Sequence, residues 1–197
     1  MVKALVVYAH PCEDSFVAEV RRRVLDGIEQ SGGAADLVDL CAEGFDPRLT
    51  AAEHAAHRGD PSTKPVAAAM APRLAACDTL VLVYPTWWSG QPAILKGWFE
   101  RTWVNGVAYR FDGDTGPPEP ALTNIRRVIV VTTHGSSKWI NAIEGESGKR
   151  FVKRALRGSV GLRCRVEWLA LYDIDRSTAD DRRRYLDKVG RRFRALR

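Results

Sequence analysis

One stretch decides the fold prediction: Thr79-Leu80-Val81-Leu82-Val83-Tyr84-Pro85-Thr86-Trp87-Trp88-Ser89-Gly90-Gln91-Pro92. Its Val/Leu-rich first half, residues 79–83, is typical of a parallel strand that is buried on both faces. The two adjacent tryptophans lie between prolines, where neither a helix face nor a strand face would use both. Tryptophans on a constrained loop after a buried strand could hold a flat ring, or they could be core residues that anchor a turn.

Outside this stretch, apolar strands alternate with amphipathic helices. Strands are predicted at residues 3–8, 34–40, 79–83, 127–133 and 163–171, and helices at 15–28, 65–76, 92–103 and 178–196. This alternation predicts an α/β fold with a five-stranded parallel sheet and helices on both faces. The Gly/Pro-rich connection 104–124 is too long for a plain crossover, so we expect it to be functional or to be a dimer arm. Because there is no repeat or low-complexity linker, residues 1–197 are predicted to form one domain.

Charge and cysteine usage narrow the class of protein. The formal net charge is +6, but residues 182–197 hold eight Arg and Lys against one Asp, so the excess lies in one terminal helix. Its apolar residues recur at helical spacing, which favours a solvated outer face over a patch for RNA or a membrane. No apolar run approaches the roughly 20 residues that cross a bilayer. The four scattered cysteines predict neither disulfides nor a metal site. We therefore expect a cytoplasmic protein with no nucleic-acid partner and no integral membrane association.

A short loop after the first strand, His10-Pro11-Cys12-Glu13-Asp14-Ser15-Phe16, delivers Ser15 to the first turn of a helix. The free N–H groups and the dipole of that turn favour an anion. His10 could donate to the same phosphate. Alternatively, Ser15 only caps the helix and His10 is a buried residue at the strand end. The loop carries neither GxGxxG nor GxxxxGK(S/T), the usual dinucleotide and nucleoside-triphosphate motifs.

The loop after the fourth strand, Thr132-Thr133-His134-Gly135-Ser136-Ser137, is small, polar and rich in backbone donors. It could meet the carbonyls and nitrogens of a ring, or it could be an ordinary hydrophilic loop. Loops after the first, third and fourth strands converge at one edge of the predicted sheet. Together they favour a flat cofactor that carries phosphate, and a flavin meets each of these requirements.

These motifs carry a resemblance to a known family. They are Y-A-H-P-x-x-x-S-F, F-D-P, Y-P-x-W-W-x-G-x-P-A-I-L-K-G-W-F-E-R, G-V-A-Y and T-T-x-G. From residue 3 to about residue 140 the chain resembles the NAD(P)H:quinone oxidoreductase (DT-diaphorase-like) branch of the flavodoxin-like flavoproteins. The resemblance implies a flavodoxin-like fold and a homodimer whose site is walled by both chains. It also implies one flavin per subunit, FAD with FMN as the alternative, and ping-pong hydride transfer from NAD(P)H to a quinone or a related electrophile.

The same resemblance implies roles for individual residues. Those that would contact the phosphate region of the flavin are His10, Ser15 and Phe16. Those that would line its ring are Pro85, Thr86, Trp87 and Trp88. Those that would face the polar edge of the ring, with backbone N–H groups that could stabilise negative charge, are Thr132, Thr133, His134 and Gly135. Tyr109 matches the first tyrosine of the family's substrate pocket.

The chain departs from the family pattern in the acceptor pocket. Phe111 stands in place of the second pocket tyrosine, and Ser89 in place of a frequent aromatic residue. Where the family places a tyrosine and a histidine after the fourth strand, the chain has Trp139 and no histidine beyond His134. His134 could protonate the acceptor, because histidine titrates near neutral pH. It could equally bond a phosphate or a neighbouring loop, with water as the proton donor. Tyr109 and His134 are therefore the catalytic candidates.

The sequence thus predicts a flavin-dependent NAD(P)H oxidoreductase that acts on quinones or related electrophiles. Two alternatives remain open. The chain could be a flavin-binding regulatory subunit of a membrane transporter, with the basic helix as its docking face. It could also be a pathway-specific reductase for one secondary metabolite. The choice between NADH and NADPH is open as well.

Overall fold

Five parallel strands form the central sheet, in the order β2-β1-β3-β6-β7. The computed structural model describes residues 1–56, 59–111 and 116–197. The strands are β1 (Lys3–Tyr8), β2 (Ala34–Asp39), β3 (Thr79–Pro85), β6 (Arg127–Thr133) and β7 (Arg165–Leu171). The chain passes from β1 outward to β2 and then back to β3 on the other side of β1, so the strand order reverses between β1 and β3. This topology confirms the predicted five-stranded parallel sheet.

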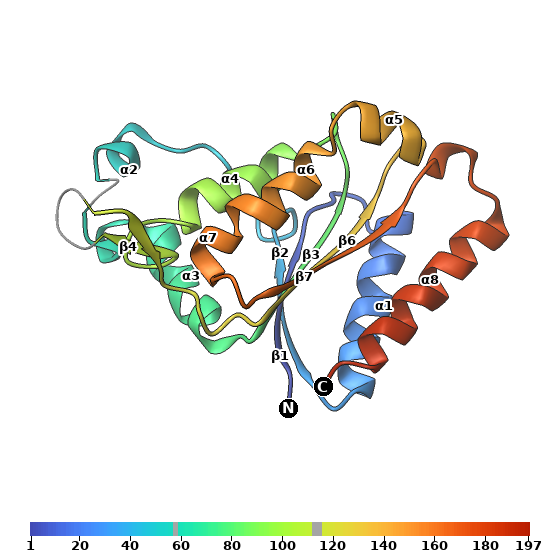
Figure 1. Cartoon of the computed structure of the whole chain (residues 1–197), viewed down its shortest axis with the longest axis horizontal. Helices are drawn as coiled ribbons and strands as arrows, with labels where there is room; N and C mark the ends of the chain where they lie inside the picture. Colours follow the sequence, from blue (N-terminus) through green and yellow to red (C-terminus); the bar gives the residue numbers. More distant parts are fainter. Residues whose placement is uncertain (57–58, 112–115) are drawn as a thin grey trace.

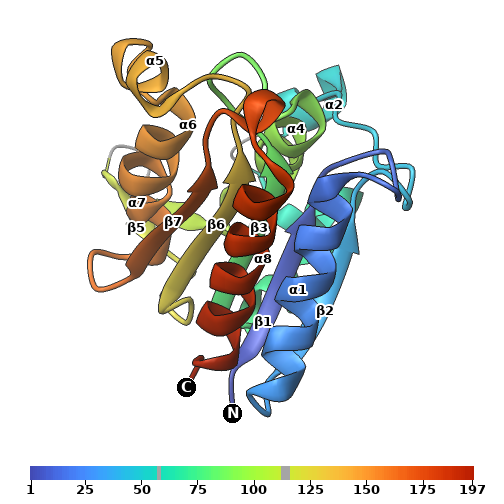
Figure 2. The same cartoon turned by 90° about the vertical axis from the view of Figure 1, so that its right-hand side faces the viewer.

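Helices cover both faces of the sheet, as predicted (Figures 1 and 2). One face carries α1 (Phe16–Gln30) and α8 (Ala179–Arg194). The other carries α3 (Pro65–Ala76), α4 (Ala93–Thr102), α6 (Ser147–Arg150) and α7 (Arg157–Val160). The remaining elements are α2 (Ala51–Ala55), α5 (Lys138–Ile143), β4 (Tyr109–Phe111), β5 (Pro118–Pro120), 3-10 turns at Pro61–Thr63 and Ile174–Arg176, and a π-helical turn at Phe151–Ala155.

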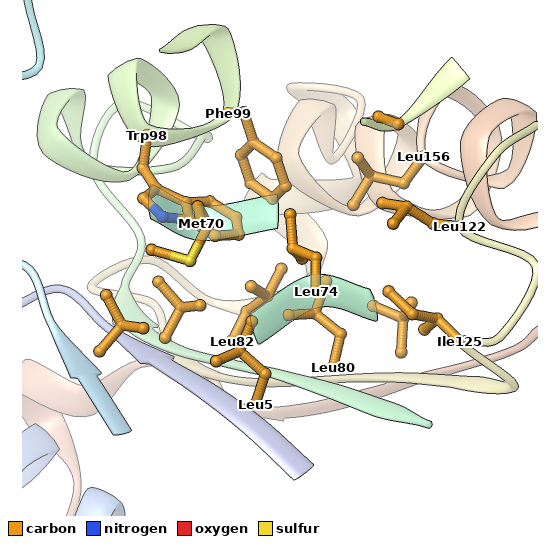
Figure 3. Close-up of a cluster of buried hydrophobic side chains, with 14 of the residues drawn as sticks. Leu5, Met70, Leu74, Leu80, Leu82, Trp98, Phe99, Leu122, Ile125 and Leu156 are labelled. Atoms are coloured by element: carbon orange, nitrogen blue, oxygen red, sulfur yellow. The ribbon is translucent and has the colours of Figure 1, made fainter. Parts of the chain in front are cut away.

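Two hydrophobic cores hold these layers together, because successive strand side chains leave opposite faces of a sheet. On one face, Leu5 and Leu82 pack with Met70 of α3 and Trp98 of α4 (Figure 3). On the other face, Val6 belongs to the core that α1 and α8 complete. The three central strands, β1, β3 and β6, are therefore apolar on both faces, and their polar residues lie at the strand ends.

Helix α4, which follows the tryptophan loop, packs unusually closely on the segment after β2. A Cβ atom on Gly97 would lie 2.3 Å from the carbonyl oxygen of Pro47, so only glycine permits this approach. Arg101 of α4 donates to the Asp46 carbonyl at 2.6 Å and pairs with Glu53 at 2.8 Å. These contacts fix the helix that supports the tryptophan loop.

The connection 104–124 contains the antiparallel β4–β5 hairpin. Residues 112–115 of this predicted functional or dimer arm lie outside the described residues. Its proposed role in a dimer remains a prediction. Over the described ranges, no helix combines the length and the apolar character that crossing a bilayer requires.

Candidate functional site

A cavity of about 470 Å³ lies at the carboxyl edge of the sheet, where the loops after β3, β6 and β7 meet. It is lined by residues 85–89, 133–136 and 174–175, together with Asn141 and Glu144. This volume is in the usual range for small-molecule sites, which run from about 300 to 1,000 Å³. The structure thus brings together the two predicted ring-binding loops, and it adds a third wall from the end of β7.

The tryptophan loop closes in a tight hairpin turn. The N–H of Trp87 donates to the Gly90 carbonyl at 3.0 Å, and the N–H of Gly90 donates back at 2.9 Å. The central residues, Trp88 and Ser89, have φ angles of 45° and 59°, the pattern of a type I′ turn. Trp87 is 61% exposed and Trp88 is 99% exposed. The alternative that both tryptophans are core residues is therefore wrong.

The segment after α5 holds this hairpin from the far side of the cavity. Ser89 Oγ donates to the Glu144 carboxylate. The Ser89 carbonyl accepts from Ser147 Oγ at 2.6 Å and from the N–H of Gly148 at 3.1 Å. A left-handed L-residue costs roughly 1–2 kcal/mol, so bonds of this kind are needed to keep Trp88 and Ser89 in the turn. We call these three bonds the Ser89 latch.

The loop after β6 supplies hydrogen-bond donors, although not all of those predicted. The N–H of His134 donates to the Leu171 carbonyl at 2.8 Å, so the expectation that this N–H is available to a ring is wrong, although His134 itself lines the cavity. The N–H groups of Gly135 and Ser136 have no partner in the part of the chain that the structure describes. A Cβ atom on Gly135 would lie 2.9 Å from Asp175 Oδ2, so glycine allows that carboxylate to approach the loop.

Thr132 stands behind the cavity wall instead of lining the cavity. Its side chain is buried, and its Oγ1 lies 3.0 Å from Thr86 Oγ1. The N–H of Thr86 also donates to the Thr133 carbonyl at 2.8 Å. Thr132 therefore fixes Thr86 of the opposite loop, whereas Thr133 and Thr86 themselves line the cavity.

His134 is buried beside the cavity, with only 4% of its surface exposed. Its ring stacks on Tyr172 at 4.5 Å, and Nε2 lies 3.4 Å from Thr86 Oγ1. Burial lowers the pKa of His134 below its ordinary value, which favours the neutral imidazole. Burial and the neighbouring Glu146 carboxylate, which accepts from Tyr172 Oη at 3.0 Å, raise the pKa of Tyr172 to about 12. Near neutral pH, neither ring is a ready proton donor.

The predicted phosphate-contacting residues lie at the start of α1, at the same carboxyl edge (Figure 2). Ser15 Oγ accepts from the N–H of Ala18 at 3.1 Å, so Ser15 does cap the helix. His10 Nδ1 accepts from the N–H of Cys12 at 3.1 Å, which shapes the loop. Phe16 packs against Tyr185 with ring centroids 6.2 Å apart. The N–H groups of Ala18 and Glu19 donate to the Ser15 carbonyl at 3.1 and 3.2 Å, whereas those of Phe16 and Val17 have no partner among the described residues, so an anion could still bind to these two.

Tyr109 is not among the residues that line the cavity of this chain. It lies on β4, where its ring meets Phe111 edge-on at 5.6 Å. Figure 1 shows β4 on the opposite side of the molecule from α5, which borders the cavity. A single copy of the chain therefore does not bring the two catalytic candidates, Tyr109 and His134, together.

Sequence reasoning missed four of the lining residues: Asn141, Glu144, Ile174 and Asp175. Ile174 and Asp175 come directly after the fifth predicted strand, so the rule that sites lie at carboxyl ends could have identified them. No comparable signal marks Asn141 and Glu144, because they follow an irregular segment whose position depends on tertiary contacts.

The donor set fits a flat, phosphorylated group such as a flavin. Two exposed indoles offer apolar surface, and the same cavity is lined by Gly135 and Ser136, whose N–H groups have no partner among the described residues. The cavity lining includes Glu144 and Asp175 and, among the described residues, no Lys or Arg. A phosphate would therefore bind outside the cavity, where the start of α1 offers free N–H groups.

Comparison with known proteins gives a consistent picture. The family model described as "Flavodoxin-like fold" matches residues 2–195. NAD(P)H dehydrogenase [quinone] 1 of Cavia porcellus is 30% identical over 152 residues, which are 68% of this chain and 54% of that protein. The chain spans about half the length of the curated relatives that it matches best.

Two solved structures are similar over nearly their full length. Smu.1420 from Streptococcus mutans UA159 is 29% identical with a TM-score of 0.84, covering 99% of this chain and 100% of that chain. The NAD(P)H:quinone oxidoreductase from Methanothermobacter marburgensis is 24% identical with a TM-score of 0.85, covering 100% of this chain and 99% of that chain. At this identity the second likeness supports the fold alone.

Proposed function

The chain belongs to the flavodoxin-like fold family, and from that premise we propose that it is a flavin-dependent NAD(P)H oxidoreductase that reduces quinones or related electrophilic acceptors. One observation carries the proposal. A cavity at the carboxyl edge of the sheet is lined by the exposed Trp87–Trp88 hairpin and by Gly135 and Ser136, whose N–H groups have no partner in the described part of the chain. The names of the curated relatives, which include NAD(P)H dehydrogenases acting on quinones, support the same activity.

The residues of this chain would share the work of holding the cofactor. The start of α1, capped by Ser15, would bind the phosphate through its free N–H groups. Trp87 and Trp88 would cover the ring and exclude water. When bound, a flavin would accept a hydride from NAD(P)H and pass it to the acceptor in two half-reactions at one site. The N–H groups of Gly135 and Ser136 would stabilise negative charge at the polar edge of the ring.

The two carboxylates of the cavity suit the nicotinamide half of the reaction. A nicotinamide ring gains positive charge when it gives up a hydride, and Glu144 and Asp175 line the cavity in which that charge would develop. Both side chains are exposed in the single chain, and their attraction for a positive charge would become strong once a bound ligand excludes water. These carboxylates would therefore favour oxidation of the nicotinamide and would disfavour anionic acceptors in the same place.

We also propose that the working unit is a homodimer whose site is completed by a second copy. Tyr109 lies far from the cavity of its own chain, and both Trp88 and Trp139 are exposed, at 99% and 73%. A partner copy would cover these indoles and bring a second Tyr109 to the acceptor pocket. FAD is the proposed cofactor, with FMN as the alternative, and the cytoplasm is the proposed compartment.

Steady-state turnover of menadione with NADH or NADPH tests the activity. Rates near the roughly 10 per second of typical enzymes would support an oxidoreductase. Flavin binding with negligible turnover would instead indicate a regulatory flavoprotein. Protein that neither retains nor binds flavin would refute the proposal altogether. Chromatography and mass spectrometry of the released cofactor would decide between FAD and FMN.

A further inference from the structure

The starts of β6 and β7 lie at the amino edge of the sheet, opposite the edge that carries the tryptophan loop (Figure 2). Residues at these strand starts line a second hollow. It consists of two cavities, of about 440 and 400 Å³, that share Arg163, Cys164 and Arg165 at the start of β7. One cavity extends to Arg126 and Arg127 at the start of β6, and the other extends to Lys153 and Arg157 of the π-helical turn and α7. We call this hollow the arginine groove.

The charge of the arginine groove is unbalanced. Six cationic residues line it, and no Asp or Glu does so among the described residues. Within the same ranges none of the six forms an ion pair. On α8, by contrast, Arg183, Arg184 and Arg192 are each paired with a carboxylate. The other five cations of residues 182–197 form no ion pair among the described residues, but they are spread along α8 and the chain end, whereas the six of the groove line one hollow.

Strand register forces two of these cations together. Arg127 and Arg165 are direct partners on neighbouring parallel strands, so their side chains leave the sheet on the same face, with backbones about 4.8 Å apart. Asp78 lines an adjoining cavity with Arg126 and Arg127, and its carboxylate accepts from the Lys3 N–H and from Thr79 Oγ1. Glu167, two residues further along β7, is the second nearby carboxylate. Arg192 binds the Glu167 carboxylate, to which its Nε donates at 2.6 Å. This hydrogen bond lowers the pKa of Glu167 more than the attraction of Arg127 and Arg165 does. The repulsion between Arg127 and Arg165 is therefore not fully relieved within the chain.

Backbone contacts fix the shape of the groove. Arg157 donates from Nη2 to the Leu162 carbonyl at 2.7 Å, which ties α7 to the loop before β7. Its Nε is buried and has no hydrogen-bond partner in the part of the chain described. The N–H of Arg165 donates to the Arg126 carbonyl at 2.9 Å, which joins the two halves of the groove. The guanidinium groups are thus carried by a framework that is already formed.

We propose that the arginine groove binds a compact oligophosphate, such as inorganic triphosphate or the phosphate chain of a nucleotide. Guanidinium groups recognise phosphate through paired, charge-assisted hydrogen bonds, and arginine is well suited to this geometry. A hollow with cations on several of its sides fits a small, highly charged anion better than a flat membrane or a long duplex. The groove is separate from the cavity of the proposed oxidoreductase site, so this inference does not depend on that activity.

Isothermal titration with inorganic triphosphate at low and moderate salt tests the proposal. The wild-type protein is expected to bind saturably, and Arg163→Gln/Arg165→Gln is expected to bind about tenfold more weakly or worse. Both side chains are exposed, so this variant should fold. Arg183→Gln/Arg184→Gln on α8 removes the same net charge and should bind like wild type. Arg126→Gln, a second exposed variant on the β6 side, should also weaken binding.

Three results would overturn the proposal. The first is the absence of saturable binding by the wild-type protein. The second is equal weakening by the groove variant and the α8 variant, which would mean that only net charge matters. The third is tighter binding of anionic vesicles or duplex DNA than of triphosphate at equal phosphate concentration, because those ligands need an extended surface and not a hollow.

Discussion

Replacement of Ser89 by alanine tests how the tryptophan hairpin is held at the cavity. Trp88 and Ser89 both have left-handed backbone angles, which together cost roughly 2–4 kcal/mol. The Ser89 latch offsets part of that cost. A hydrogen bond to a charged group contributes about 1.5–3 kcal/mol when buried. The bond from Ser89 to Glu144 is solvent-exposed, so we reduce this to about 1 kcal/mol.

A loss of about 1 kcal/mol corresponds to an effect of about fivefold. Ser89→Ala is therefore expected to weaken flavin binding about fivefold, measured by fluorescence titration of FAD or FMN with the apoprotein. Glu144→Gln keeps an acceptor and should cost less. Ser31→Ala is the matched control, because it also removes one serine hydrogen bond, 2.6 Å long, but at the far end of α1. Equal weakening by Ser31→Ala and Ser89→Ala, or no effect of Ser89→Ala, would refute the idea that the latch prepares the hairpin for the cofactor.

Two further predictions concern stability, each measured by urea unfolding. Gly97→Ala should destabilise the protein by about 1–3 kcal/mol, because its Cβ would lie 2.3 Å from the carbonyl oxygen of Pro47. A Cβ atom on Gly158 would meet no atom within 4 Å, so Gly158→Ala should instead stabilise α7 by about 0.5–1 kcal/mol. If both variants changed the free energy of unfolding in the same direction, the packing described for α4 would be contradicted. Burial lowers the pKa of His134 from its ordinary value of 6.5. Below that pH the unfolded chain therefore binds more protons than the folded chain. The free energy of unfolding should fall as the pH drops through about 6.5. His134→Phe should flatten this dependence and the exposed His54→Phe should not; if the two variants respond alike, His134 is not the group responsible.

The strands and the main loops could be predicted because their signals are local. The runs of Val, Leu and Ile that mark β3 and β6 are typical of strands buried on both faces. The rule that ligands bind at carboxyl ends then placed the loops after β1, β3 and β6 at one edge. The match to the flavodoxin-like family confirms the resemblance that these motifs carried.

The details of the site could not be predicted because they depend on distant contacts. A type I′ turn usually carries Asn-Gly, so nothing in the pair Trp88–Ser89 indicates one. The turn is held by Glu144, Ser147 and Gly148, which lie more than fifty residues away in the sequence. The partner of the His134 N–H is likewise supplied by β7.

Summed charge also concealed a local feature. The excess of Arg and Lys in residues 182–197 accounts for the net charge of the whole chain, so the remainder looks neutral. Only the fold brings Arg126 and Arg127 beside Arg163 and Arg165. Only the side-chain contacts show that these four arginines form no ion pair among the described residues, whereas several arginines of α8 do.

Anaerobic reduction of the flavin-loaded protein tests the central claim most directly. If the cavity between the tryptophan hairpin and residues 133–136 holds a flavin that exchanges hydride with NAD(P)H, then NADH or NADPH should bleach the visible absorbance of the bound flavin. A quinone added afterwards should restore it. Protein that binds no flavin, or a bound flavin that neither NADH nor NADPH reduces, would contradict the account.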